Sequence, residues 1–343
     1  MRALVLRQYN ELVYEEVADP ELKAHEVLVQ VKACGICGSD VHGMDGSTGR
    51  RIPPVIMGHE ASGVITETGP EVDGLSRGDR VTFDSTVYCG HCRFCRKGHI
   101  NLCDNRRVLG VSCDDYRRHG ALAEYVAVPE HIVYRLPDGV SFEHAAMVEP
   151  LSIGVHAVEI TPLSLNDTVV VVGTGMIGLC IVQVLRSAGC GRIIAVDIDP
   201  WRLELASKVG ADATILADRP DAKDDLRRAI GQAGADAAFE AVGIEASVNM
   251  AAMCLRKGGN LTVVGNISPT VQMPLQAMVT RELAVRGSCA SNGEYPACLD
   301  LIARKAVDLE PLLSASAPLA EGAKWFKRLY DQQENLMKVV LVP

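Results

Sequence analysis

The stretch Val169-Val-Val-Val172-Gly173-Thr-Gly175-Met-Ile-Gly178 decides the fold of this chain. Its valines predict a buried strand, and the glycines follow with the spacing G-x-G-x-x-G, directly before an apolar run of helical length. The first glycine permits a tight turn, the second lets a pyrophosphate approach the backbone, and the third lets helix and strand pack closely. We therefore predict a βαβ dinucleotide-binding unit in which Met176 and Ile177 also contact the cofactor.

The next predicted strand, 193–197, ends in Asp197, 19 residues beyond Gly178, where a ribose-binding acid is expected. A carboxylate about 4 Å from a 2′-phosphate would cost about 4 kcal/mol at an effective dielectric of about 20, or about a thousandfold in affinity. Asp197 thus favours NAD over NADP. Arg202 and Val264 complete the candidate cofactor-binding residues, although an arginine at such a position is more often solvated surface.

The pattern around this unit divides the chain of 343 residues into two parts. Beyond about residue 165, apolar strands alternate with helical stretches, which predicts an α/β fold with a doubly wound parallel sheet. The first 150 residues read instead as short β-rich runs broken by Gly, Pro and Asp turns. The predicted strands are 26–31, 63–66, 169–172, 193–197, 237–240 and 261–264, and the predicted helices are 176–188, 200–209 and 244–256.

Composition and charge exclude several classes of protein. With 48% hydrophobic and 22% charged residues, the chain lies outside the range of disordered proteins. Its net charge of -9 repels phosphate polyanions, so we expect no nucleic-acid partner. The start of the sequence lacks the apolar stretch of a secretory signal, and the uncharged run 169–185 is interrupted by three glycines. We therefore expect a cytoplasmic protein with no membrane partner.

Four cysteines lie within one 15-residue segment, at spacings of two, two and seven intervening residues: Cys89, Cys92, Cys95 and Cys103. Four thiolates can close a tetrahedral zinc site and leave no position for water. Free thiols in an exposed loop would instead be susceptible to oxidation. We predict a structural zinc ion at this cysteine loop.

A second, dispersed set of candidate metal ligands consists of Cys37, His59, Glu60 and Glu149. The run Cys34-Gly-Ile-Cys37 could suggest redox chemistry, but it does not belong to a thioredoxin-type βαβ unit, so metal binding is the better use of Cys37. A histidine beside a glutamate is usually a polar pair in a turn. The chemistry of these residues by itself leaves their assignment open.

With these motifs in this order, the sequence resembles the zinc-dependent medium-chain dehydrogenases over essentially its whole length. Gly58-His59-Glu60-Ala-Ser-Gly63 is similar to the zinc-containing alcohol dehydrogenase signature. Two further motifs most resemble the sorbitol or polyol dehydrogenase branch: Cys37-Gly-Ser39-Asp40-Val-His42 and Glu149-Pro-Leu-Ser-Ile-Gly-Val-His156.

The resemblance implies a fold, a domain organisation and an assembly. The fold would be a GroES-like β-rich catalytic domain, formed by residues 1–152 and 290–343, that encloses a Rossmann domain at 153–289. The assembly would be a homodimer or homotetramer, for which the sequence itself offers only the apolar segment 282–286 as an edge-strand candidate.

The resemblance also implies roles for individual residues. Cys37 and His59 would bind a catalytic zinc ion, and Glu60 and Glu149 would share the third protein position. Zinc would act as a Lewis acid that lowers the pKa of a bound alcohol. The alcohol proton would pass to Ser39 and onward, through the cofactor ribose, to His42. Asp40 would orient neighbouring groups.

The implied reaction is NAD-dependent oxidation of a secondary hydroxyl of a polyol to a ketose, with two zinc ions per chain. The alternatives are the same chemistry on an alditol phosphate, on L-threonine or on a small diol. An alternative of another class is a non-enzymatic structural protein that binds the cofactor. The full set of candidate site residues argues against that class, because a structural role needs no open metal site.

Two positions depart from the sorbitol dehydrogenase pattern. Gly43 follows His42 where an aromatic residue is typical, and Ala290-Ser291 stand where an arginine–aromatic pair is expected. These changes would open the pocket and remove a hydroxyl-binding guanidinium, which leaves the identity of the polyol open. An arginine cluster could hold a sugar phosphate or a carboxylate, or it could be solvated surface charge: Arg106, Arg107, Arg117 and Arg118.

Overall fold

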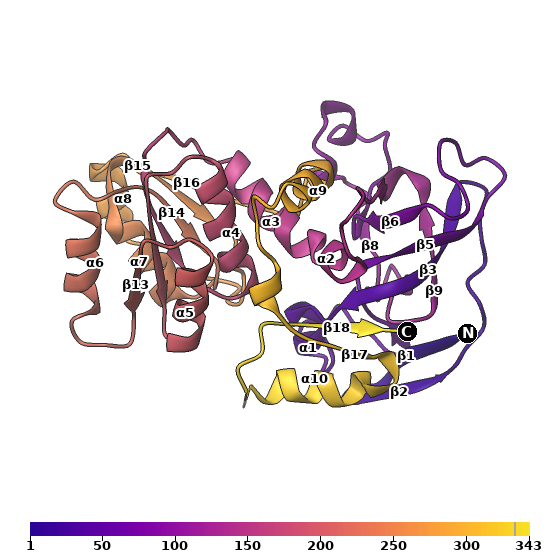
Figure 1. Ribbon diagram of the computed structural model, residues 1–343. Helices are drawn as coiled ribbons and strands as arrows, with labels where there is room; N and C mark the ends of the chain where they lie inside the picture. Colours follow the sequence, from indigo (N-terminus) through magenta and orange to yellow (C-terminus); the bar gives the residue numbers. More distant parts are fainter. Residues whose placement is uncertain (333) are drawn as a thin grey trace. The chain divides into compact units, whose positions relative to one another are not determined.

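The computed structural model describes residues 1–332 and 334–343, which divide into two compact units (Figure 1). The first unit comprises 1–149, 292–304 and 312–343, and the second comprises 150–291 and 305–311. The division at 149/150 falls inside one continuous helix, α3 (Val148–Glu159), whose Gly154 packs on Cys180 of the second unit.

The segment 305–311 belongs to the second unit, where the sequence analysis had placed it in the first. Gln183 explains this difference. Its side-chain amide donates to the carbonyl of Asp308 at 3.0 Å and accepts from the amide of Asp308 at 2.6 Å. This paired hydrogen bond holds the returning chain against the second unit before the chain re-enters the first.

The second unit is built on a parallel sheet with the strand order β13-β12-β11-β14-β15-β16. Val169 of β11 pairs with Ile193 on one side and with Ala237 on the other, so the strand order reverses direction beside β11. Ligands bind at such a reversal in open α/β sheets. The strands are β11 (Thr168–Val172), β12 (Arg192–Asp197), β13 (Ala213–Leu216), β14 (Ala235–Glu240), β15 (Leu255–Val263) and β16 (Ala284–Gly287).

Two layers of helices cover this sheet (Figure 1). Helices α4 and α5 pack on each other and on β12, whereas α6 packs on α7, which contacts β14 and β15. The helices are α4 (Met176–Ser187), α5 (Pro200–Lys208), α6 (Ala222–Ile230), α7 (Glu245–Cys254) and α8 (Leu275–Thr280). The doubly wound fold is thus confirmed, and β13 and α6 are elements that the sequence analysis did not identify.

The first unit is β-rich, as predicted. Its main sheet has the order β10-β6-β5-β3-β18-β17, and β9 also pairs with β3. A three-stranded sheet, β2-β1-β4, and the pair β7-β8 complete it. The strands are β1 (Arg2–Gln8), β2 (Glu11–Glu16), β3 (Glu26–Gly35), β4 (Val55–Ile56), β5 (Glu60–Thr68), β6 (Arg80–Phe83), β7 (Thr86–Val87), β8 (Arg107–Val108), β9 (Tyr125–Pro129), β10 (Val133–Arg135), β17 (Leu313–Pro318) and β18 (Lys338–Val342).

The register of the main sheet brings distant segments to the end of β3. Gly35 pairs with Glu60 of β5 on one side and with Val340 of β18 on the other. The chain then enters α1 (Gly38–Gly43), with Cys37 as its N-cap. The other helices of this unit are α2 (Phe142–Ala146), α9 (Tyr295–Ala303) and α10 (Gly322–Asp331). The end of β3 therefore gathers the start of β5, the start of β18 and the start of α1.

Each unit has its own apolar core. Leu4, Ile65 and Phe83 are fully buried in the first unit, and Val170, Ile194 and Leu261 are fully buried in the second. Burial of one such side chain contributes about 1.5–3 kcal/mol. Among the helices of residues 1–332 and 334–343, none has both the length and the apolar character needed to cross a membrane.

Candidate metal and cofactor sites

The cysteine loop brings its four sulfurs together as predicted. Cys89, Cys92, Cys95 and Cys103 have ligand atoms that all lie within 4.8 Å of one another. The Sγ atoms of Cys92 and Cys95 are 3.5 Å apart, and those of Cys103 and Cys89 are 3.6 Å apart. A tetrahedron with zinc–sulfur bonds of about 2.3 Å has edges of about 3.8 Å. The geometry therefore fits a zinc ion.

Polar groups of the same loop favour thiolates at Cys89 and Cys92, whereas burial raises the pKa of Cys95. Hydrogen bonds from the backbone amide of His91 and from the side chain of Asn105 lower the pKa of Cys89 to about 6. The backbone amide of Asn105 also donates a hydrogen bond to Cys103 Sγ, at 3.3 Å. The short 3-10 helices η1 (Cys95–Lys97) and η2 (Ile100–Leu102) turn the chain between the ligands. The loop thus supplies both the ligands and their stabilising donors.

The dispersed set converges at the end of β3. Cys37, His59 and Glu60 have ligand atoms within 4.8 Å of one another, with His59 and Glu60 buried and Cys37 partly exposed. A thiolate, an imidazole and a carboxylate are ligands that zinc takes in proteins. The partly exposed side of the cluster leaves room for a further ligand. The residues therefore fit a catalytic zinc ion.

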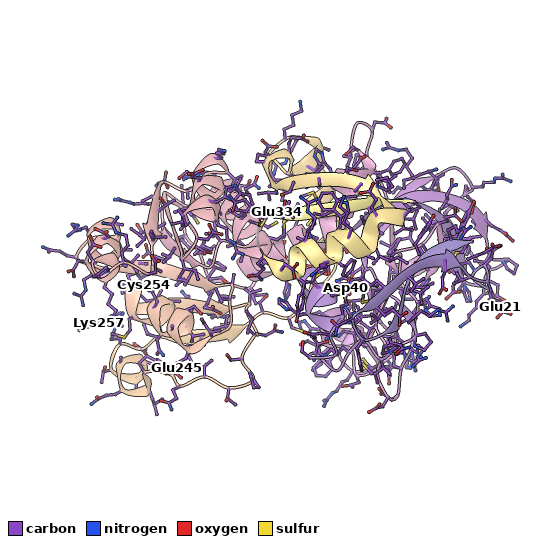
Figure 2. The ribbon with its side chains drawn as sticks, turned by 90° about the horizontal axis from the view of Figure 1, so that it is seen from below. Glu21, Asp40, Glu245, Cys254, Lys257 and Glu334 are labelled. Carbon is purple, nitrogen blue, oxygen red and sulfur yellow. The ribbon has the colours of Figure 1, made fainter. Side chains whose placement is uncertain are left out.

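Asp40 holds the histidine of this cluster from behind. Its Oδ2 atom lies 3.3 Å from His59 Nδ1, and its side chain is fully buried. Figure 2 labels Asp40 among the side chains of the first unit. Burial by itself would raise the pKa of Asp40, but the Arg51 guanidinium and the His59 ring hold it well below its usual range. Burial would likewise lower the pKa of His59, yet the charges of Asp40 and Cys37 raise it.

Lys338, at the start of β18, is a functional residue that sequence reasoning missed. Its ammonium donates to both carboxylate oxygens of Glu60, at 2.9 and 2.6 Å, and to the carbonyl of Ile36 at 3.1 Å. Both side chains are at least 95% buried. Gly35 leaves the space for this carboxylate, because a Cβ atom there would collide with Glu60 Oε2. A lysine heading the apolar run 339–342 was the available signal.

Glu149 lies outside the cluster defined by the 4.8 Å limit. Ser85 donates a hydrogen bond to its Oε1 atom at 3.2 Å. Burial, together with the nearby carboxylates of Glu60 and Asp84, raises the pKa of Glu149 to about 7, although the charge of His59 opposes this. The structure thus brings a second carboxylate into the electrostatic surroundings of the cluster.

The two residues of the predicted proton relay lie on α1. The Ser39 hydroxyl is 3.2 Å from the sulfur of Cys37, and its side chain is exposed. His42 is also exposed, at the other end of the same short helix, where its carbonyl accepts a hydrogen bond from Ser47 at 2.6 Å. Ser39 therefore sits at the open side of the cluster, and His42 faces solvent.

The glycine motif has the geometry that a dinucleotide requires. Gly173 has a φ of 91°, which other residues rarely adopt, and a Cβ atom at Gly178 would collide with the carbonyl of Gly173. At Gly175, by contrast, a Cβ atom would meet open space. Helix α4 begins there without a side-chain cap, so its first amides are available to a phosphate.

Asp197 is the last residue of β12 and contacts Thr174 in the glycine motif. Its Oδ2 atom accepts hydrogen bonds from the amide of Thr174 at 2.6 Å and from its hydroxyl at 3.0 Å. Arg202 on α5 forms an ion pair with Asp199, the N-cap of that helix, with Nε 3.4 Å from Oδ2. The backbone amide of Val264 donates a hydrogen bond to the carbonyl of Glu240 at 2.8 Å. Gly173, Asp197 and Val264 thus lie at the carboxyl ends of strands β11, β12 and β15, whereas Arg202 lies on α5.

Comparisons with known proteins identify the family of this chain. Residues 23–138 match the family described as "Alcohol dehydrogenase GroES-like domain", and residues 177–304 match "Zinc-binding dehydrogenase". The sorbitol dehydrogenase of Bacillus subtilis (strain 168) is 33% identical over 348 residues, covering 100% of this chain and 97% of the relative. The chain belongs to the zinc-dependent medium-chain dehydrogenase family.

Further relatives of this dehydrogenase include an enzyme and a solved structure. D-xylulose reductase A of Aspergillus oryzae (strain ATCC 42149 / RIB 40) is 34% identical over 333 residues, covering 94% of this chain and 92% of the relative. The crystal structure of a Sinorhizobium meliloti 1021 protein bound to NADP superposes with a TM-score of 0.90 at 31% identity. It covers 100% of this chain and 99% of the other.

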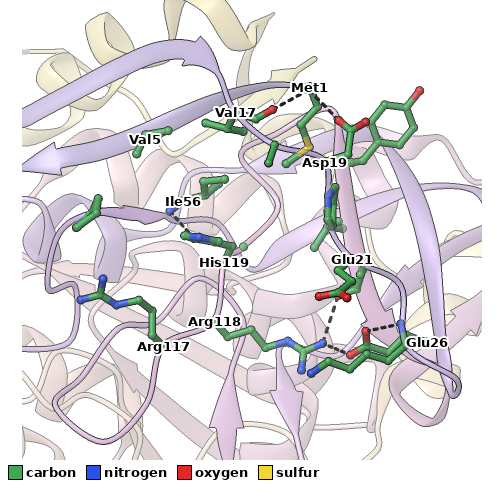
Figure 3. Close-up of a pocket in the computed structure, with 18 of the residues that line it drawn as sticks. Met1, Val5, Val17, Asp19, Glu21, Glu26, Ile56, Arg117, Arg118 and His119 are labelled. Atoms are coloured by element: carbon green, nitrogen blue, oxygen red, sulfur yellow. Dashed lines mark hydrogen bonds and ion pairs between the residues drawn. The ribbon is translucent and has the colours of Figure 1, made fainter.

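Three arginines of the cluster, Arg107, Arg117 and Arg118, line a separate cavity of the first unit, where Figure 3 labels Arg117 and Arg118. The cavity has a volume of about 560 Å³, and none of the dispersed ligand set is among the residues lining it. Arg118 pairs with Glu26 at 2.9 Å, and Arg117 donates to the hydroxyl of Ser112 at 3.0 Å. Arg106 donates instead to the carbonyl of Asn101 at 3.1 Å. These contacts give structural roles to three of the arginines and do not connect them with the catalytic cluster.

Proposed function

We propose that this dehydrogenase oxidises a secondary hydroxyl of a polyol to a ketose, with NAD as hydride acceptor and two zinc ions per chain. The observation that carries the proposal is the convergence of Cys37, His59 and Glu60 on one point, with Ser39 at its open side. The named sugar-alcohol and ketose enzymes among the relatives support polyols as the substrate class.

In this proposal zinc, held by Cys37, His59 and one of two carboxylates, supplies Lewis-acid chemistry to an alcohol oxygen. The protein's own residues supply the rest. Asp40 fixes the orientation of the His59 ring. Ser39 takes the proton of the alcohol, and His42 returns it to solvent, for which its exposed position is suited.

Glu60 and Glu149 share the third protein position. Lys338 neutralises Glu60 inside the protein. Glu149 keeps a pKa of about 7 in a buried position, so it is the carboxylate whose charge state changes most easily near neutral pH. We propose that one ligates directly while the other acts from outside the coordination sphere.

NAD is the proposed cofactor because Asp197 presents a buried carboxylate at the end of β12, where the sequence motif predicts the ribose to bind. Its Oδ1 atom also accepts the amides of Ile198 and Asp199, so it is rigidly held. We expect Asp197→Ala to raise the ratio of NADP to NAD efficiency at least about tenfold. Thr174→Val, which removes one donor to Asp197 and keeps the charge, is the matched control. An unchanged ratio in Asp197→Ala would remove Asp197 from this role.

The substrate class is tested by following NAD reduction across alditols, alditol phosphates, L-threonine and short diols, with and without a zinc chelator. We expect chelator-sensitive turnover on alditols. Turnover confined to alditol phosphates, to L-threonine or to diols would replace the polyol by that class. Absence of turnover on every class, in protein shown to hold two zinc ions per chain, would favour the non-enzymatic alternative.

We further propose a homo-oligomer that works in the cytoplasm. Strand β16 is the last strand in the order of the parallel sheet, and Val285 on it is 38% exposed. An edge strand of this kind can pair with a second copy. Twelve cysteines in one chain, four of them gathered in the cysteine loop, suit a reducing compartment. Light scattering of the purified protein tests the assembly, and a monomer would contradict it.

A further inference from the structure

Arg51 is a buried arginine that none of the sequence motifs includes. It lies between α1 and β4, and its side chain is 4% exposed. The Nε atom donates to Asp40 Oδ1 at 2.8 Å, and an Nη atom lies 2.6 Å from the same oxygen. Another Nη atom donates to the backbone carbonyl of Arg50 at 3.0 Å. The guanidinium is therefore held in one orientation.

Arg51 contacts the side chains of Asp40 and Ser39, and each of these contacts a ligand of the catalytic cluster. Asp40 lies against the ring of His59, and Ser39 lies against the sulfur of Cys37. Arg51 Nη2 is 3.4 Å from the Ser39 hydroxyl, so one guanidinium reaches the residue behind the histidine and the residue beside the thiolate. A planar group with several donors can hold two acceptors at once, which an ammonium on a flexible stem does less well.

The backbone that carries Arg51 is fixed by a neighbouring segment. The amide of Ile52 donates to the carbonyl of Ser112 at 3.1 Å, and the amide of Ser112 donates to the carbonyl of Arg50 at 3.2 Å. Ser112 itself is fully buried. The position of the Arg51 side chain therefore does not depend on a mobile loop.

Gly43 provides the space that Arg51 needs. A Cβ atom at this position would lie 2.5 Å from Cγ and 3.4 Å from Cβ of Arg51. The aromatic residue expected after His42 would occupy the path of the arginine stem. The departure of this chain at Gly43 and the presence of a buried Arg51 are therefore two parts of one arrangement.

We propose that Arg51 is a positioning residue that holds Asp40 and Ser39 together, and that Gly43 is the residue that admits it. The effect on Ser39 rests on the proposed function, since it concerns transfer of the alcohol proton. The effect on Asp40 and His59 concerns retention of the metal and stands independently of the substrate.

The test compares Arg51→Ala, Arg51→Lys and the control Arg50→Ala, which keeps the carbonyl that Arg51 uses. Each is loaded with Co²⁺ in place of zinc, and the visible absorption and the rate of metal loss to a chelator are measured. Loss of a residue that orients a metal ligand typically costs about 10–100-fold in affinity or activity. We expect metal loss about tenfold faster in Arg51→Ala, an intermediate rate in Arg51→Lys, and the unaltered rate and spectrum in Arg50→Ala.

Turnover with zinc provides the second readout. We expect kcat in Arg51→Ala to fall at least about tenfold with KM changed less than about threefold. We also expect a larger solvent deuterium isotope effect, because the Ser39 hydroxyl loses its orientation. A folded Arg51→Ala variant with unchanged metal loss, spectrum, kcat and isotope effect would overturn the proposal. If the unaltered protein oxidises no alcohol, the proposed function fails, while the Co²⁺ measurements still decide the role of Arg51.

A double-mutant cycle of Gly43→Ala and Arg51→Ala tests the link between these two residues. Gly43→Ala should accelerate metal loss in the otherwise unaltered protein, because the new Cβ atom collides with the Arg51 side chain. In a protein that already carries Arg51→Ala, Gly43→Ala should have little effect, because the Arg51 Cγ atom is absent. If Arg51→Ala does not fold, Gly43→Ala and Arg51→Lys carry the test. Metal loss and kcat unchanged in both would overturn the proposal, as would effects of Gly43→Ala and Arg51→Ala that simply add.

Discussion

The two candidate metal clusters of the first unit are built in different ways. The cysteine loop draws its ligands and their hydrogen-bond donors from residues 89–105. The catalytic cluster instead joins Cys37 to His59 and Glu60, and buried charges from distant segments surround it: Arg51 beside Asp40, and Lys338, 278 residues from Glu60. A local loop can organise around its metal, whereas a dispersed site has to be organised by the fold.

The largest effect that separates the two clusters is expected from Cys37→Ser. We expect turnover to fall by about a thousandfold or more, because the catalytic metal loses its thiolate, while NAD affinity and the melting temperature stay nearly unchanged. Steady-state kinetics, NAD titration and calorimetry measure these. Cys34→Ser, at the other end of the same motif, is the matched control and should retain turnover. Retained activity in Cys37→Ser would contradict the catalytic assignment.

Lys338→Met tests the claim that the fold organises the dispersed cluster. It leaves the Glu60 carboxylate buried without its partner, which costs about 3–5 kcal/mol in the free energy of unfolding. Chemical denaturation of the metal-free protein measures this cost. The double variant Lys338→Met/Glu60→Gln should recover most of it, since the uncompensated charge is gone. Equal destabilisation of the single and double variants would mean that the ion pair is not the cause.

A substitution in the cysteine loop should lower stability and largely keep turnover, which is the opposite of the result expected for Cys37→Ser. We expect Cys95→Ser to lower the free energy of unfolding by about 2 kcal/mol through local unfolding of residues 89–105, and to reduce turnover less than tenfold at low temperature. Hydrogen exchange of this segment, with and without chelator, is the measurement. Loss of protection throughout the first unit would show that the loop is not an independent element.

Replacing Glu149 is expected to have a smaller effect, on the pH dependence of stability. Burial raises its pKa from 4.5 to about 7, so between these values the folded protein keeps a proton that the unfolded chain has lost. In metal-free protein, this group therefore makes stability fall as pH rises from about 5 to 7, by at most about 1.4 kcal/mol per pH unit. Denaturation at several pH values should show a flatter profile in Glu149→Gln. The same slope in both proteins would refute the raised pKa.

Sequence patterns predicted what depends on neighbouring residues. Gly173 and Gly178 are required by one strand–turn–helix geometry, Gly175 leaves space beside the start of α4, and the spacing of the cysteine loop suffices for a tetrahedral site. Arg51 was missed because a single charged residue gives no local pattern. Lys338 stands at the head of an apolar run, but that position does not say which carboxylate it pairs with, since this depends on the sheet register. Gly43 was noticed as a departure, but its meaning emerged only with the arginine stem packed against it.

The segment 305–311 and helix α6 were missed for related reasons. The first is held by the Gln183 amide, a contact between residues 125 positions apart in the chain. Helix α6 is largely polar, and only Ala222 and Leu226 are buried, so few apolar side chains mark it in the sequence. Contacts of long sequence separation, and elements with few apolar residues, are the parts of this fold that a pattern does not show.

The most direct test of the account is the zinc content of three proteins measured together with their turnover on alditols. The account predicts two zinc ions per chain in the unaltered protein, one in Cys37→Ser with turnover lost, and one in Cys95→Ser with turnover largely kept. Cys37→Ser that holds two zinc ions and remains active, or Cys95→Ser that loses both ions, would contradict the division into one catalytic and one structural site.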